Sequence, residues 1–179
     1  MLATKSVLSK KKLILNQSAN ILTMLNLSSG CLALILVMKG HALLGAVLIF
    51  VAALFDMYDG KVARSLNVSS EFGKQLDSLA DLISFGVAPA LLIYQNILYE
   101  YSIAGILLTL MYILCGAMRL ARFNVTTFTG SFQGLPIPAA GCALALFFIS
   151  RSFIPSALFM VFLLCLSVLM IGTFKVKKI

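Results

Sequence analysis

Six long runs of apolar side chains, separated by short polar stretches, constrain the fold of this chain most strongly. Each run approaches the roughly 20 residues that an α-helix needs to cross a bilayer. The 179 residues are 61% hydrophobic and 11% charged, with a mean hydropathy of +1.05, which excludes an ordinary soluble domain. The sequence therefore predicts an all-α integral membrane protein with six transmembrane helices. We expect these helices at about residues 20–38, 42–64, 70–97, 102–123, 137–153 and 157–174.

The segments outside the apolar runs are basic. Residues 1–19 contain four lysines, and they form either a short helix on the membrane surface or a solvated cytoplasmic tail. Residues 175–179 form a second basic tail, so residues 20–174 are predicted to be a single transmembrane domain. Pro89 lies inside the third apolar run, where it predicts a kink.

The distribution of lysine and arginine predicts the orientation in the membrane. Six spans place both termini on one side, and that side receives all of the 14 basic residues except Lys39 and Arg151. The positive-inside rule then places the termini in the cytoplasm and the protein in the cytoplasmic membrane. The net charge of +8 gathers at helix ends and chain termini, which favours lipid headgroups or phosphate substrates over nucleic acid as partners.

Four of the six acidic residues lie close together in the chain, as Asp56, Asp59, Asp77 and Asp81. Spacings of three and four residues place each pair on one face of a helix. Two such helices facing each other would gather four carboxylates at the membrane edge, where isolated charges are costly. Carboxylate oxygens select hard cations, and such a cluster can hold two of them about 3.5–4 Å apart. The pattern therefore predicts a two-cation site that clamps phosphate groups.

The residues between the aspartates suit a phosphate substrate. Gly60 and Gly73 leave room for a ligand beside the backbone, Ala63 keeps that face narrow, and Arg64 can pair with a phosphate. Asp81, the last of the four aspartates, is the natural group to take a proton from an attacking hydroxyl.

The motif Asp-x2-Asp-Gly-x2-Ala-Arg-x8-Gly-x3-Asp-x3-Asp, from residue 56 to residue 81, resembles the signature of the CDP-alcohol phosphatidyltransferases at every defined position. The resemblance implies a six-helix catalytic domain, a homodimer, and a Mg²⁺- or Mn²⁺-dependent transfer of a phosphatidyl group from a CDP-linked lipid to an alcohol, with release of CMP. It implies that all four aspartates bind metal and that Asp81 is also the general base. By the same resemblance, the CDP-lipid site comprises Asn20, Gly60, Ala63, Arg64, Ser70 and Gly73.

The acceptor alcohol is indicated by other stretches. Residues 20–30, 77–89, 119–124 and 134–138 look like segments of the serine-using members of that family. They favour transfer from CDP-diacylglycerol to L-serine, giving phosphatidylserine, with Arg119, Arg122 and Asn124 expected to bind serine. An arginine would serve a phosphorylated alcohol equally well, so glycerol 3-phosphate and inositol or its phosphate are alternative acceptors.

Two other interpretations of the aspartates compete with an enzyme. Ion pairs with Lys61, Arg64 and Lys74 could satisfy the carboxylates, but they do not explain the spacing of the two glycines. A cation transporter would also place acids in the membrane, although spread through the bilayer on several helices. For the enzyme we expect a single in-line displacement, and a covalent intermediate on one of the carboxylates stays open.

Overall fold

The computed structural model describes residues 2–65, 71–125, 132–172 and 175–176, and the side chains of residues 20–61, 71–125 and 134–172. The described part is almost entirely helical. The elements in chain order are α1 (Leu2–Met38), α2 (Ala42–Ser65), α3 (Glu71–Asp81), the π-helical η1 (Leu82–Val87), α4 (Ala88–Asn96), the 3-10 helix η2 (Leu98–Tyr101), α5 (Ser102–Val125), the strand β1 (Phe132–Gln133), α6 (Ile137–Ile149), the 3-10 helix η3 (Arg151–Phe153), α7 (Ser156–Ile171) and the strand β2 (Lys175–Val176).

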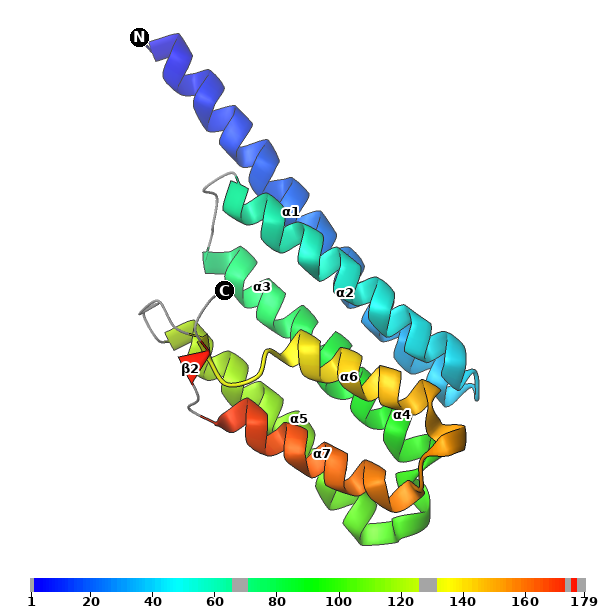
Figure 1. The fold of residues 1–179 in the computed structure, drawn as a ribbon. Helices are drawn as coiled ribbons and strands as arrows, with labels where there is room; N and C mark the ends of the chain where they lie inside the picture. The colour runs from blue at the N-terminus through cyan, green and yellow to red at the C-terminus, as the bar shows by residue number, and fades with distance from the viewer. Residues whose placement is uncertain (1, 66–70, 126–131, 173–174, 177–179) are drawn as a thin grey trace.

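The helices form one elongated bundle (Figure 1). α1 and α2 pack against each other as an antiparallel pair, and α5 packs against α7. α6 contacts α2, η1 and α4, which places the third apolar run inside the bundle. The end of α2, the start of α3 and the end of α5 lie at the same end of the bundle (Figure 1). This arrangement brings both halves of the aspartate motif to one end of the molecule.

The fold fits a membrane protein, as the sequence predicts. Four helical segments in the described part are long and apolar enough to cross a bilayer, at Asn20–Met38, Ala42–Lys61, Glu71–Asn96 and Leu98–Val125. α6 and α7 are apolar but shorter, at 13 and 16 residues. The all-α membrane fold is thus confirmed. That six helices cross the membrane stays a prediction.

Helix bounds differ from the sequence-based expectation at two places. α1 runs without a break from Leu2 to Met38, so the boundary expected at residue 20 is not a helix end. Its N-terminal part extends beyond the rest of the bundle (Figure 1). The other difference is a short antiparallel pairing of β1 with β2, which the sequence analysis did not predict. Gly134 follows β1 with φ of +73°, and an added Cβ would lie 2.6 Å from the Met170 carbonyl oxygen, so only glycine fits there.

The third apolar run contains a π-helical stretch, η1, that ends two residues before Pro89, and the kink predicted at Pro89 stays a prediction. Pro89 has no N–H to donate to the carbonyl of Phe85, four residues earlier. The hydroxyl of Tyr112, a fully buried residue of α5, donates to this carbonyl oxygen at 3.0 Å. A side chain of a neighbouring helix therefore satisfies the backbone group that proline frees, as membrane helices require.

Tyr112→Phe is expected to destabilise the protein by about 1–3 kcal/mol, because it leaves the buried Phe85 carbonyl without this donor. The measurement is thermal or denaturant unfolding of the purified protein in detergent. Tyr99→Phe is the matched control, since Tyr99 is 71% exposed. Equal stability of Tyr112→Phe and the control would contradict the assigned role of the hydroxyl.

One face of α1 is buried along the described part of the helix, at Thr23, Asn26, Gly30, Ala33 and Val37. These residues alternate in steps of three and four, as one helix face requires. A Cβ on Gly30 would overlap with the side chain of Ser84, so glycine allows α1 to approach η1 closely. The Ser84 hydroxyl also donates to the backbone carbonyl of Asn26 at 3.1 Å. α1 is thereby fixed beside the chain segment that follows Asp81.

Candidate metal and substrate site

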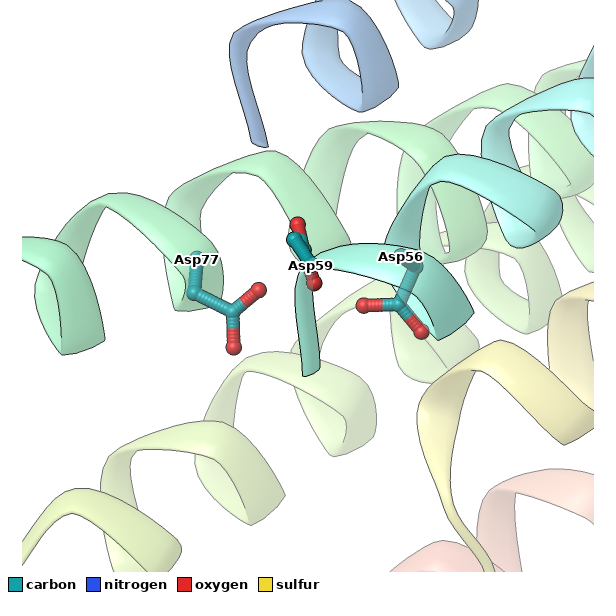
Figure 2. Close-up of side chains that lie close together, drawn as sticks. All are labelled: Asp56, Asp59 and Asp77. Carbon is teal, nitrogen blue, oxygen red and sulfur yellow. The ribbon is translucent and has the colours of Figure 1, made fainter. Parts of the chain in front are cut away.

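Three aspartates from two helices form a compact group of carboxylates. Asp56 and Asp59 lie on α2 and Asp77 lies on α3, and one oxygen of each lies within 4.8 Å of the others. Asp59 is only 5% exposed, and the other two are half-buried. Figure 2 shows Asp59 between Asp56 and Asp77. Three carboxylates this close repel one another unless a cation neutralises them, so the geometry agrees with the predicted oxygen-ligand site.

The surroundings of the group also suit a divalent cation. Among the described residues, Oδ1 of Asp77 is buried and has no hydrogen-bond partner. Lys74, a proposed ion-pair partner, donates instead to the backbone carbonyl of Asn124 at 3.0 Å. Lys61 is exposed, with its ammonium group 5.8 Å from the centre of the Tyr58 ring. These contacts favour a cation over lysine as the partner of the carboxylates.

Asp81 lies one helical turn after Asp77, at the end of α3. It is 7% exposed, and Asp56, Asp77 and Asp59 are its acidic neighbours. It does not belong to the group of three that converges within 4.8 Å. A buried carboxylate that adjoins a metal group without forming its centre is well placed to accept a proton.

The two remaining acidic residues, Glu71 and Glu100, are exposed. The four aspartates gather where α2 and α3 meet, and no other group of described His, Cys, Asp or Glu side chains converges in the same way. A path for cations would need acids along the bilayer depth, so this distribution disfavours the transporter alternative.

The residues predicted for the CDP-lipid site are described only in part. Gly60 and Gly73 are half-buried, on the same helices as the aspartates. Asn20 is half-buried on α1, one turn before Thr23. The side chains of Ala63 and Arg64, and the whole of Ser70, lie outside the described residues. The nucleotide-binding roles of these residues stay predictions.

The structure separates the three residues predicted to bind serine. Arg119 on α5 is partly buried, it has Asp81 as its charged neighbour, and its Nε is buried without a hydrogen-bond partner in the described part. Arg122 donates to the carbonyl of Ile171 at 3.1 Å, which ties α5 to the end of α7. Asn124 donates to the hydroxyl of Ser78 at 2.9 Å and thereby joins α5 to α3. Of the three, Arg119 has an electrostatic interaction with Asp81 and a buried Nε that lacks a hydrogen-bond partner in the described part.

Two polar residues of α1 that the sequence analysis did not single out also contact the cluster. Thr23 donates to Oδ2 of Asp59 at 2.9 Å, and Nδ2 of Asn26 donates to Oδ1 of Asp81 at 3.4 Å. The available signal was their spacing of three residues inside an otherwise apolar span, in register with Gly30. Such a pair needs buried polar partners, and the aspartates are those partners.

Comparison with known proteins places the chain in one family. The family model described as CDP-alcohol phosphatidyltransferase matches residues 16–174. A protein named archaetidylserine synthase, from Methanothermobacter thermautotrophicus, is 41% identical over 165 residues, which cover 89% of this chain and 69% of that protein. The chain belongs to the CDP-alcohol phosphatidyltransferase family, so the predicted class of enzyme and the resemblance of the motif are confirmed.

Two further relatives carry the name CDP-diacylglycerol–serine O-phosphatidyltransferase. The protein from Bacillus subtilis is 45% identical over 108 residues, covering 59% of this chain and 61% of that protein. The protein from Methanocaldococcus jannaschii is 44% identical over 122 residues, covering 68% of this chain and 55% of that protein. The chain thus aligns with little more than half of the length of these two relatives.

Proposed function

We propose that this protein transfers the phosphatidyl group of a CDP-linked lipid, CDP-diacylglycerol or its archaeal counterpart, to L-serine, with release of CMP. The observation that carries the proposal is the convergence of the Asp56, Asp59 and Asp77 carboxylates within 4.8 Å, with the buried Asp81 one helical turn after Asp77. Arg119 of α5, whose Nε is buried without a hydrogen-bond partner among the described residues, interacts electrostatically with Asp81. The proposal thus combines a site for phosphate groups at the three carboxylates, a base at Asp81, and a guanidinium at Arg119 that can bind the carboxylate of serine. The names of the relatives, two for serine phosphatidyltransferases and one for archaetidylserine synthase, support the same reaction.

We propose that Asp56, Asp59, Asp77 and Asp81 hold two divalent cations, Mg²⁺ or Mn²⁺. The convergence of three carboxylates and the unpartnered Oδ1 of Asp77 support this assignment. When bound, the cations supply positive charge that offsets the charge of the pyrophosphate and of the departing CMP. The CDP-lipid itself is assigned to Gly60, Ala63, Arg64 and Gly73 by the match to the family motif, and to Asn20 and Ser70 by the wider resemblance to the family.

The proposed chemistry is one displacement at phosphorus. Asp81 accepts the proton of the serine hydroxyl, and the serine oxygen forms a bond to the lipid-side phosphorus. The bond from that phosphorus to the bridging oxygen breaks, and CMP leaves with the electron pair. The guanidinium of Arg119 pairs with the serine carboxylate and thereby orients the hydroxyl beside Asp81. Arg122 and Asn124, which hold α5 against α7 and α3, keep Arg119 in place.

The setting proposed for this reaction is a cytoplasmic membrane, with both termini and the aspartate cluster on the cytoplasmic side, in a homodimer. The basic residues Lys61, Lys74, Arg119 and Arg122 belong to the last part of α2, the start of α3 and the last part of α5, whereas Lys39 follows α1 and Arg151 begins η3. The end of α2, the start of α3 and the end of α5 lie at one end of the bundle, and the turn between α1 and α2 lies at the other (Figure 1). This asymmetry supports the orientation.

The function is tested by CMP release from purified protein given CDP-diacylglycerol, Mn²⁺ and one alcohol at a time. Release with L-serine is expected, and removal of divalent cations by a chelator is expected to abolish it. Glycerol 3-phosphate and inositol serve as the competing acceptors. Release with one of these and none with serine would reject the proposed acceptor while keeping the transferase chemistry. Comparing CMP release from the archaeal CDP-diether lipid with that from CDP-diacylglycerol identifies the preferred lipid backbone.

A further inference from the structure

We propose that Thr23 and Asn26 of α1 are positioning residues for the aspartate cluster, so that α1 forms a third wall of the metal site. Thr23 orients Asp59 of α2, and Asn26 orients Asp81 of α3. The inference rests on the cation site of the proposed function. It assigns to α1 a role in that site that the mostly apolar sequence of this helix does not indicate.

The hydrogen bond from Thr23 to Asp59 is the shorter of the two contacts that α1 makes with the aspartates. Its hydroxyl donates to Oδ2 of Asp59 at 2.9 Å, and both residues are 5% exposed. In a buried setting, water cannot compete for either group, so the hydroxyl defines which way the carboxylate faces. The bond thereby sets the direction in which the Asp59 carboxylate faces Asp56 and Asp77.

Asn26 has a corresponding position one turn later. It is fully buried, and its Nδ2 donates to Oδ1 of Asp81 at 3.4 Å, a longer and weaker contact than that of Thr23. A carboxylate only accepts hydrogen bonds, so the nitrogen of the amide has to face it. The amide oxygen is buried without a partner among the described residues, and the contact to Asp81 is therefore the one that accounts for a polar side chain at this position.

α1 is held in the register that these contacts need. Thr23 and Asn26 continue the buried face that contains Gly30, where the absence of a side chain lets α1 approach Ser84. Ser84, which follows Asp81 by only three residues, donates its hydroxyl to the backbone carbonyl of Asn26. The two donors are thus fixed before any ligand binds, which is how partners of ligating carboxylates act on metal affinity.

The test measures Mn²⁺ binding by electron paramagnetic resonance titration of the full chain in detergent, without substrates. Thr23→Val, which keeps the shape and removes the hydroxyl, is expected to weaken Mn²⁺ binding about 10- to 100-fold. Thr23→Ser keeps the donor and is expected to restore binding close to that of the unchanged protein. Thr109→Val is the matched control, because Thr109 is 4% exposed and its hydroxyl donates to Gly105 within α5.

Asn26→Leu provides an independent variant, since it removes the donor to Asp81 together with the unpartnered amide oxygen. We expect its kcat to fall about 10- to 100-fold with an unchanged KM for the CDP-lipid. Unchanged Mn²⁺ affinity in Thr23→Val, or an equal loss in Thr109→Val, would overturn the role of Thr23, and unchanged kcat in Asn26→Leu would overturn that of Asn26. If the unchanged protein binds Mn²⁺ but transfers nothing to serine, the proposed function fails, while the role of Thr23 is still decided by the Mn²⁺ titration of Thr23→Val. The role of Asn26 is then decided by the same titration of Asn26→Leu, in which unchanged Mn²⁺ affinity would overturn it.

Discussion

Asp81→Asn is expected to lower kcat for CMP release about 10²- to 10⁴-fold, the range that a positioned general base contributes. The physical reason is that an amide cannot accept the proton of the serine hydroxyl. The substitution keeps the size of the side chain and an oxygen for the bond from Asn26. It also removes one of four neighbouring carboxylates that repel one another, so we expect the fold to persist. The measurement is single-turnover CMP release with saturating CDP-diacylglycerol and L-serine.

The control for Asp81→Asn separates loss of the base from loss of the substrate site. Binding of CDP-diacylglycerol, followed by titration, is expected to stay within a few-fold of the unchanged protein, and turnover is compared at saturating Mn²⁺ because Asp81 is also a proposed metal ligand. Glu100→Gln, which removes an exposed acid of η2 outside the aspartate group, is expected to leave turnover unaltered. Turnover of Asp81→Asn near that of Glu100→Gln would refute the general-base role. Recovery of turnover in Asp81→Asn when the Mn²⁺ concentration is raised would reassign Asp81 to a metal ligand alone.

The aspartate cluster was predictable because the spacing of the aspartates along the chain determines which carboxylates lie together. Steps of three and four residues fix which side chains share a helix face, and burial of carboxylates at a membrane edge leaves few alternatives. The structure accordingly brings Asp56, Asp59 and Asp77 together from two helices. The bounds of α2 and α5 were also predictable within a few residues, since apolar runs and their polar ends define them.

Contacts between distant helices were the part that the sequence could not supply. Nothing in the local pattern relates Tyr112 to the carbonyl that Pro89 leaves unpaired, because the contact depends on how α5 packs beside η1. The pairing of β1 with β2 joins residues more than forty positions apart. Thr23 and Asn26 looked like isolated polar residues of a span until the packing placed them beside Asp59 and Asp81.

The same limit explains why Arg119 and Arg122 could not be distinguished by sequence. They lie three residues apart at the end of one helix, so local spacing gives both the same surroundings. The packing of α7 gives Arg122 a carbonyl partner, whereas Arg119 has Asp81 as its charged neighbour. The electrostatic interaction of Arg119 with the proposed base and its buried, unpartnered Nε are the reasons for which we assign the serine carboxylate chiefly to Arg119.

Arg119→Lys is expected to raise the KM for L-serine about 10- to 100-fold, which corresponds to the roughly 1.5–3 kcal/mol of a hydrogen bond to a charged group. Lysine keeps the positive charge but loses the planar fork that includes the unpartnered Nε. Because the CDP-lipid is assigned to other residues, its KM should change little. The measurement is the initial rate of CMP release over a range of serine concentrations at saturating CDP-diacylglycerol.

Arg122→Lys serves as the comparison, because it changes the same chemistry one turn away. Its KM for serine should stay near that of the unchanged protein, while its unfolding temperature should fall through the weakened contact with Ile171. A rise in KM for serine confined to Arg122→Lys would exchange the roles of the two arginines. A rise in the KM for CDP-diacylglycerol in Arg119→Lys, with serine unaffected, would move Arg119 to the nucleotide-lipid site and leave the serine carboxylate without its assigned partner.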